Sequence, residues 1–201
     1  VTPLRKLSAL EKRNIVGMSR KELSSALIDT ALLPKNLKMR ENQIWAWIYQ
    51  KGIKSFDLMT NISKEYRETL KENFTIERPK VIKKQISNDG TRKYLLKLAD
   101  GNEIEAVYIP EKNRGTLCIS SQVGCTLNCS FCFTGTQKLV RNLTTGDIVG
   151  QVLTVRDDLN EWPSHDKPRD SKRQISNIVM MGMGEPLYNY DSVRDALHIV
   201  M

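Results

Sequence analysis

The chain contains little from which a membrane span or a disulfide framework could be built. Its longest apolar run, IVMMGM at 178–183, is far too short to cross a bilayer. No segment combines a basic start, an apolar middle and a small-residue cleavage site, so nothing marks the chain for secretion. Only four of the 201 residues are cysteines, and in a reducing compartment clustered cysteines indicate metal ligands or catalytic thiols rather than disulfides. We therefore expect a cytoplasmic protein that does not associate with membranes.

Charge is abundant, and it is unevenly distributed along the chain. Residues 1–80 hold 16 Lys and Arg against 9 Asp and Glu, a net charge of +7, whereas residues 81–201 hold 15 against 14. A basic front region suits a polyanionic partner such as RNA, because phosphate contacts supply most non-specific affinity. A solvated charged surface without a partner has the same composition, and charge alone leaves both interpretations open.

Residues 1–80 show the periodicity of three short helices. The first begins at Ser19, which has capping-box spacing to Glu22, and ends before Pro34. The second lies in ENQIWAWIYQKG and ends at Gly52, and the third starts at Asn61 or Ser63. The apolar residues at helical spacing are Leu23, Ala26, Leu27, Ile44, Trp47, Ile48, Tyr66, Leu70 and Phe74. We expect a basic helical RNA-binding domain over residues 1–80, with Trp47 in its core and Trp45 either packed or available for base stacking.

In the second region, residues 81–113, the spacing of the apolar residues changes from that of helices to that of strands. The segments VIKKQIS, TRKYLLKL and EIEAVYIP are separated by the turn sequences Asn-Asp-Gly at 88–90 and Asp-Gly-Asn at 100–102, which predicts three antiparallel strands in a meander. In the last strand, Glu103 and Glu105 share a face opposite Ile104 and Ala106. The pattern by itself indicates only that this pair faces solvent.

From residue 114 onward, strands and helices alternate. GTLCIS is a strand candidate, TGDIVGQVLTVRDDL is a helix capped by Thr144 or Thr145, QISNIVMMG is a second strand, and another helix begins behind Asp191. A polar connector at 160–173 precedes the second strand, whose apolar composition predicts a parallel strand covered on both faces. The predicted fold class is α/β, with a small N-terminal helical domain, a β meander and, over 114–201, the first part of a TIM-like (β/α) barrel.

The segment GCTLNCSFCFTG contains Cys125, Cys129 and Cys132 in the spacing C-x-x-x-C-x-x-C. Structural zinc and electron-transfer clusters use four protein ligands, whereas three loop thiolates can hold a 4Fe-4S cluster and leave one iron open to a substrate. Cys118 lies on the predicted strand, where the sheet fixes its direction, so we do not expect it to join them. A zinc site formed by all four cysteines and inert buried cysteines are the alternatives.

This loop, placed after a first parallel strand, resembles that of the radical S-adenosylmethionine (SAM) superfamily. MMGMGEP at 180–186 resembles the superfamily's glycine-glutamate motif for the amino end of SAM, although Gly-x-Gly-Glu-Pro alone is compatible with a plain turn. The segments EAVYIP, TLCISSQVGC, CSFCFTG and NIVMMGMGEPL resemble more narrowly the adenine-C2 RNA methyltransferases of the RlmN type. The C8 methyltransferases of the Cfr type are their nearest relatives.

The resemblance implies a function and a set of site residues. The substrates would be adenine carbon 2 in 23S rRNA, at the peptidyl-transferase centre, and in tRNA, and a partner such as flavodoxin would supply electrons. The cofactors would be a 4Fe-4S cluster and SAM. Glu105 matches the family's proton acceptor, and Cys118 matches the cysteine that releases the product by forming a disulfide. The implied ligands are Cys125, Cys129 and Cys132 for the cluster, and Gly184 and Glu185 for SAM.

Two alternatives to this function remain, and one element of the family pattern is missing. A Cfr-type enzyme would use the same residues for C8, and a non-enzymatic RNA-binding protein would use its cysteines for zinc. No cysteine follows Cys132 to carry the methyl group, and two strand–helix units fall short of a full barrel of about 250 residues. We therefore expect the N-terminal part of a longer, monomeric enzyme that is inactive as this chain alone.

Overall fold

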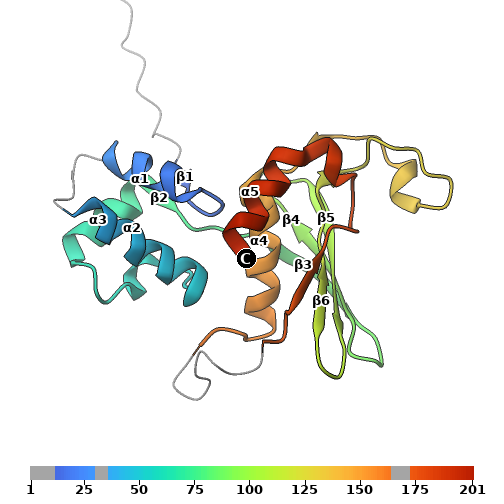
Figure 1. Ribbon diagram of the computed structural model, residues 1–201, viewed down its shortest axis with the longest axis horizontal. Helices are drawn as coiled ribbons and strands as arrows, with labels where there is room; N and C mark the ends of the chain where they lie inside the picture. The colour runs from blue at the N-terminus through green and yellow to red at the C-terminus, as the bar shows by residue number, and fades with distance from the viewer. Residues whose placement is uncertain (1–11, 30–35, 164–172) are drawn as a thin grey trace, which may run out of the picture.

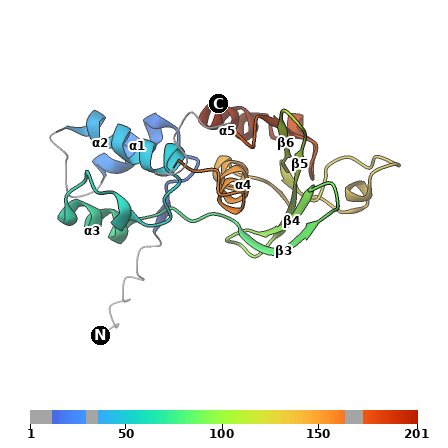
Figure 2. The same ribbon diagram turned by 90° about the horizontal axis from the view of Figure 1, so that it is seen from below.

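The computed structural model describes residues 12–29, 36–163 and 173–201 (Figure 1). A small helical region lies beside a five-stranded sheet, and helices α4 and α5 lie between them (Figure 2). Most of the polar connector predicted at 160–173, and Pro34 at the predicted end of the first helix, fall outside the described residues. Within those residues, no helix is long and apolar enough to span a membrane.

The helical region consists of α1 (Arg20–Ile28), α2 (Leu37–Trp45) and α3 (Lys64–Asn73). A π-helical turn, Ala46–Gln50, extends α2, and a 3-10 turn, Phe56–Leu58, precedes α3. The predicted capping box is confirmed, since Ser19 and Glu22 exchange side-chain and backbone hydrogen bonds. Ser63 caps α3, and Gly52 follows the π-helical turn with a φ of +65°. The buried apolar residues of these helices are Leu23, Ala26, Leu27, Ile44, Ile48, Tyr66 and Leu70.

The two tryptophans of this region pack against the edge of the core. Trp47 Nε1 donates to Asn61 Oδ1 at 2.6 Å, and the Lys51 ammonium lies 3.6 Å from the Trp47 ring centre. The Trp45 ring lies 4.5 Å from that of Tyr49. Both rings therefore have partners within the protein.

One pairing in this region was not predicted. Phe74 does not belong to α3 but begins β2 (Phe74–Thr75), which pairs in parallel with β1 (Arg13–Asn14). This pairing joins the start of the described chain to the end of α3. The pairing joins residues about sixty positions apart in the sequence, so no local sequence pattern could predict it.

The main sheet has the strand order β3-β4-β5-β6-β9. Its strands are β3 (Lys80–Ile86), β4 (Arg92–Lys97), β5 (Glu103–Pro110), β6 (Gly115–Cys118) and β9 (Asn177–Val179). The two predicted hairpin turns are present, with Gly90 and Gly101 at positive φ. The first three pairings are antiparallel, and β6 pairs with β9 in parallel. The meander and the first parallel strands thus form one continuous sheet, which the sequence did not predict.

One face of the sheet is buried beneath α4 (Thr145–Asp158), the helix that connects β6 to β9. Thr144 caps α4 and forms a second capping box with Asp147. After β9, a 3-10 turn (Pro186–Asn189) leads into α5 (Tyr190–Val200), which packs on α4 (Figure 2). The buried residues on the α4 face are Tyr94, Leu96, Ile104, Ala106, Tyr108 and Leu117.

The prediction of a second parallel strand covered on both faces is wrong. β9 has three residues and lies at the edge of the described sheet, so it has one neighbouring strand. Asn177 is exposed, and Ile178 and Val179 are only partly buried. The apolar run continues past the strand into a loop, where Met181 is 81% exposed and Met183 is buried.

The chain segments that follow β6 and β9 lie in direct backbone contact. Gly182 N donates to Ile119 O at 3.0 Å, and Gln122 N donates to Met183 O at 3.2 Å. A Cβ atom on Gly182 would lie 2.7 Å from the Ile119 carbonyl, and one on Gly184 would lie 2.4 Å from Gln122 Cβ. These glycines are therefore required for close packing of protein against protein.

A buried carboxylate, Glu41, joins α2 to α1. Its side chain is 3% exposed and accepts hydrogen bonds from Ser24 Oγ at 2.7 Å, Arg20 Nη1 at 2.9 Å and Lys38 Nζ at 3.3 Å. Burial alone would raise its pKa, but the hydrogen bonds from Ser24, Arg20 and Lys38 together outweigh burial, so the pKa of Glu41 lies below its ordinary value.

We predict that Glu41→Gln lowers the free energy of unfolding at pH 7 by about 1–3 kcal/mol, because charge-assisted hydrogen bonds are lost. A lowered folded-state pKa contributes stability that is present above the ordinary pKa of 4.5 and is lost as the pH falls through the folded-state value. Urea unfolding should therefore show a difference between wild type and variant that shrinks below pH 4.5. The control, Glu68→Gln, removes an exposed ion pair and should cost under about 0.5 kcal/mol. Equal losses in the two variants would contradict the role of Glu41.

We also predict that Gly184→Ala destabilises the chain more than Gly101→Ala does. Both glycines have positive φ, at +93° and +88°, so alanine is strained at each site by about 1 kcal/mol. Only at Gly184 does the added methyl overlap another residue, which should cost about 1–3 kcal/mol more, whereas nothing lies within 4 Å of Gly101. Chemical denaturation of both variants measures the difference, and equal losses would show that the contact with Gln122 relaxes freely.

Candidate functional site

Ser120, two residues after β6, is fully buried and joins three elements. Its backbone N–H donates to Gln151 Oε1 at 2.8 Å, and Gln151 Nε2 donates back to Ser120 O at 3.0 Å. Its hydroxyl donates to Glu105 O at 2.6 Å and accepts from Met183 N at 2.9 Å. These hydrogen bonds fix the end of β6 to α4, to β5 and to the segment after β9.

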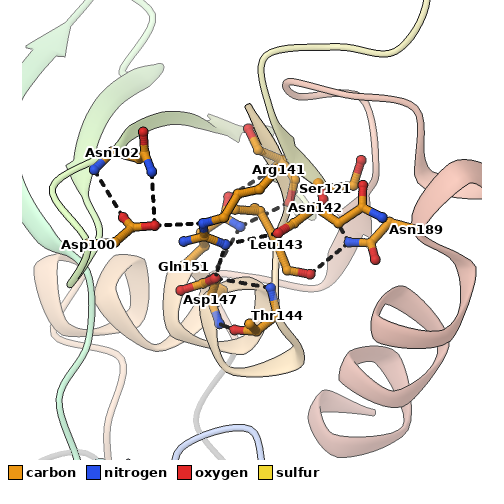
Figure 3. Close-up of polar contacts among 11 residues, drawn as sticks. Asp100, Asn102, Ser121, Arg141, Asn142, Leu143, Thr144, Asp147, Gln151 and Asn189 are labelled. Carbon is orange, nitrogen blue, oxygen red and sulfur yellow. Dashed lines mark hydrogen bonds and ion pairs between the residues drawn. The ribbon is translucent and has the colours of Figure 1, made fainter. Parts of the chain in front are cut away.

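Two further buried amides continue this connection. Gln122 Oε1 accepts from Glu185 N at 3.0 Å. Asn189 Nδ2 donates to both Ser121 O and Leu143 O at 2.8 Å (Figure 3). The start of the cysteine loop and the Gly184–Glu185 segment are therefore held at the same edge of the sheet.

The structure places Glu105 and Cys118 on the same face of the sheet, the one turned away from α4. Cys118 lies opposite Val107 in the β5–β6 pairing, and Val107 is two residues from Glu105. Because residues opposite each other in a pair and residues two apart in a strand project to the same side, Glu105 and Cys118 are diagonal neighbours. Both are partly exposed. We call this face, with Lys83, Lys93, Leu95, Lys97, Glu105, Val107 and Cys118, the open face.

The two side chains differ in their electrostatic surroundings. The Glu105 carboxylate forms an ion pair with Lys93 Nζ at 2.8 Å. Burial raises the pKa of the Cys118 thiol, and a hydrogen bond with the Met181 backbone opposes this shift without cancelling it. Cys118 is therefore mainly a thiol at neutral pH, and it needs a base before it can act as a nucleophile.

The cysteine loop follows β7 (Gln122–Val123) and ends at β8 (Arg141–Asn142), and these two strands pair in an antiparallel arrangement. Cys125, Cys129 and Cys132 are free and partly exposed. Cys132 N donates to Cys129 O at 3.1 Å, and a 3-10 turn, Phe133–Thr136, follows. A hydrogen bond from the Gly135 backbone lowers the pKa of the Cys132 thiol, which favours the thiolate that binds metals.

The three loop thiols match a 4Fe-4S cluster in type and in number. They do not converge, because within 12–29, 36–163 and 173–201 no group of three His, Cys, Asp or Glu side chains has a metal-binding arrangement. Cys118 is held on β6 by the sheet, apart from the loop. The donor set therefore fits a cluster with three protein ligands, provided that the loop closes around it.

Arg141 anchors the returning end of this loop. Its Nε contacts Asp100 Oδ2 at 2.6 Å in the β4–β5 turn, and its Nη1 contacts Asp147 Oδ2 at 2.8 Å in the first turn of α4 (Figure 3). The Arg141 guanidinium lowers the pKa of Asp100 to about 2. The loop is thus fixed to both the sheet and the helix where it ends, and the sequence analysis missed this contact.

Gly184 and Glu185 follow β9, and Glu185 N contacts Gln122 Oε1 at the start of the cysteine loop. Glu185 is partly buried, and its Oε1 accepts from Leu187 N at 3.1 Å, which caps the following 3-10 turn. The resemblance implied that Gly184 binds SAM, and in the structure the backbone of Gly184 lies against Gln122.

The sequence did not predict the buried polar residues at the edge of the sheet where the cysteine loop begins. The only local signal is Gln151, a polar residue in the middle of an otherwise apolar stretch of α4. Ser120, Gln122 and Asn189 lie in segments whose partners are far away in the sequence.

Comparison with known proteins gives matches along nearly the whole chain. Residues 13–76 match the family described as the ribosomal RNA large subunit methyltransferase N-terminal domain. A protein from Paracoccus denitrificans named dual-specificity RNA methyltransferase RlmN is 60% identical over 197 residues, 98% of this chain and 50% of that protein. Its namesake from Roseobacter denitrificans is 61% identical over 188 residues, 94% of this chain and 48% of its own length.

A solved structure agrees with this relationship. The crystal structure of a radical SAM methyltransferase from Sphaerobacter thermophilus superposes with a TM-score of 0.79 at 33% identity, covering 94% of this chain and 52% of that one. The predicted α/β fold class is thereby confirmed. The chain spans about half the length of the curated relatives it matches. As the motifs predicted, the chain is similar along nearly its whole length to RlmN-type radical SAM methyltransferases.

Proposed function

We propose that the chain is part of a radical SAM RNA methyltransferase that methylates carbon 2 of adenine in 23S rRNA, at the peptidyl-transferase centre, and in tRNA. One observation carries the proposal. The segments after β6 and β9 lie side by side, so the cysteine loop and Gly184–Glu185 share the carboxyl edge of parallel strands. Barrel enzymes hold their active sites at this edge. The names of the relatives support RNA as the substrate.

The cofactors of this reaction would bind at that edge. Cys125, Cys129 and Cys132 would hold a 4Fe-4S cluster, and Gly184 and Glu185 would bind the amino end of SAM. When bound, the cluster supplies the electron that cleaves SAM to a carbon radical, which is needed because adenine C2 has no lone pair for polar methyl transfer. A reducing partner such as flavodoxin would supply that electron to the cluster.

Two residues of the open face would act on the RNA. Glu105, held by Lys93, would accept the proton from the adenine carbon. Once deprotonated, Cys118 would attack the sulfur that joins enzyme and base; a disulfide bond would form as the sulfur–carbon bond breaks, and the carbon would take the bonding electron pair and a proton to become the methyl group of the product. The cysteine that carries the methyl group would come from the part of the relatives' length that the chain does not match.

Residues 1–80 would bind the RNA as a separate helical domain. Their net charge of +7 supports this role, and residues 81–113 and 114–201 would form the meander and the first part of the barrel. The enzyme would work as a monomer in the cytoplasm.

We predict that anaerobic reconstitution loads the wild-type chain with about four iron atoms, as expected for a 4Fe-4S cluster. Cys125→Ala, Cys129→Ala and Cys132→Ala should each lose most of the iron and the visible absorbance, because each removes one of three ligands. Cys118→Ala is the control and should retain both, since Cys118 belongs to the sheet. Iron, sulfide and zinc analysis measures the outcome.

Two results would contradict the cofactor assignment. Loss of iron in Cys118→Ala would indicate a cluster with four protein ligands and no iron open to SAM. Stoichiometric zinc with no iron in the wild-type chain would favour the zinc-stabilised RNA-binding protein.

A further inference from the structure

The cations of β3 and β4 are divided between the two faces of the sheet. Lys84 and Arg92 point toward α4, where both pair with Asp158, at 2.7 Å and 2.9 Å. Lys83, which lies beside Lys84, pairs with Leu95 in the sheet register, so it projects to the opposite side. Lys93 and Lys97 share that side, because each is two residues from Leu95.

The same register carries these lysines toward the proposed reaction residues. Lys83, Leu95 and Glu105 form one row across β3, β4 and β5. The next row runs from Lys93 through Val107 to Cys118. The open face thus presents lysines on β3 and β4, the apolar side chains of Leu95 and Val107 in its middle, and the proposed reaction residues Glu105 and Cys118 on β5 and β6.

Lys80 lies opposite Lys97 in the sheet register, so it projects to the same side. Among the residues that the structure describes, no carboxylate forms an ion pair with Lys80, Lys83 or Lys97. Lys93 pairs with Glu105, and the face carries one more carboxylate, Glu103, which lies opposite Lys97.

Protection of an exposed sheet edge is the ordinary explanation for lysines on an outer strand. It accounts for Lys83 on β3 but not for Lys97 on β4, which has neighbouring strands on both sides. Lys80 on the edge strand faces Lys97 on the interior strand, and such a row of ammonium groups is complementary to a chain of phosphates.

We propose that the open face is an RNA-binding surface, on which Lys80, Lys83 and Lys97 contact the phosphate backbone and direct the target nucleotide across Leu95 and Val107 to Glu105 and Cys118. The inference rests on the proposed function in taking RNA as the substrate. It adds a second contact surface to the basic helical region, on the sheet itself.

The test compares adjacent lysines on opposite faces. Lys83→Gln with Lys97→Gln removes two cations of the open face, and Lys84→Gln removes the same type of charge from the face under α4. The probe is an unmodified RNA hairpin with the peptidyl-transferase-centre sequence, and affinity is measured between 50 and 300 mM KCl. Thermal unfolding verifies that each variant is folded.

We expect the double variant to bind at least tenfold more weakly at low salt. The slope of log K against log salt should become shallower by about 0.7 for each lost contact to single-stranded RNA. Lys84→Gln should stay within twofold of wild type. Equal weakening by Lys84→Gln, or unchanged binding by the double variant, would overturn the proposed surface while RNA binding itself stands. A wild-type chain that binds no RNA would instead overturn the RNA substrate in the proposed function, and this surface with it.

Discussion

The hydroxyl of Ser120 is the contact on which the arrangement of the site depends. It donates to the Glu105 carbonyl and accepts from the Met183 amide, while Gln151 satisfies both backbone groups of the same residue. Ser120 and Gln151 are fully buried, and an unpaired donor or acceptor in the protein interior costs about 1–3 kcal/mol. The geometry in which all four of these hydrogen bonds form therefore fixes β5, α4 and the segments after β6 and β9 relative to one another.

The cysteine loop is anchored to the rest of the protein at both of its ends. Gln122 and Arg141 hold the start and the return of the cysteine loop, while its three thiols are partly exposed and form no metal-binding group among the described residues. Anchored ends with an adaptable middle suit a loop that has to wrap a ligand. The sheet meanwhile separates two tasks, since the face under α4 supplies the core and the open face presents Glu105 and Cys118.

The sequence predicted what local contacts determine. The capping box at Ser19, the helix cap at Thr144 and the hairpin turns at Gly90 and Gly101 act within a few residues, and all are present. Contacts between distant segments were missed, such as Ser120 with Met183, which are 63 residues apart. The burial of the short β9 was misjudged because an apolar run does not reveal whether both faces of the strand are covered. Cysteine spacing identified the candidate ligands, but it could not show that the thiols lie apart.

If the three thiols and the Gly184–Glu185 segment share one edge, as the proposed function requires, a bound cluster would keep one iron open to SAM. Electron paramagnetic resonance of the reconstituted, dithionite-reduced chain, recorded with and without SAM, tests this arrangement. We expect SAM to shift the g values of the cluster signal, because its amino and carboxylate groups would bind the open iron. A cluster signal that saturating SAM leaves unchanged would exclude an iron open to SAM.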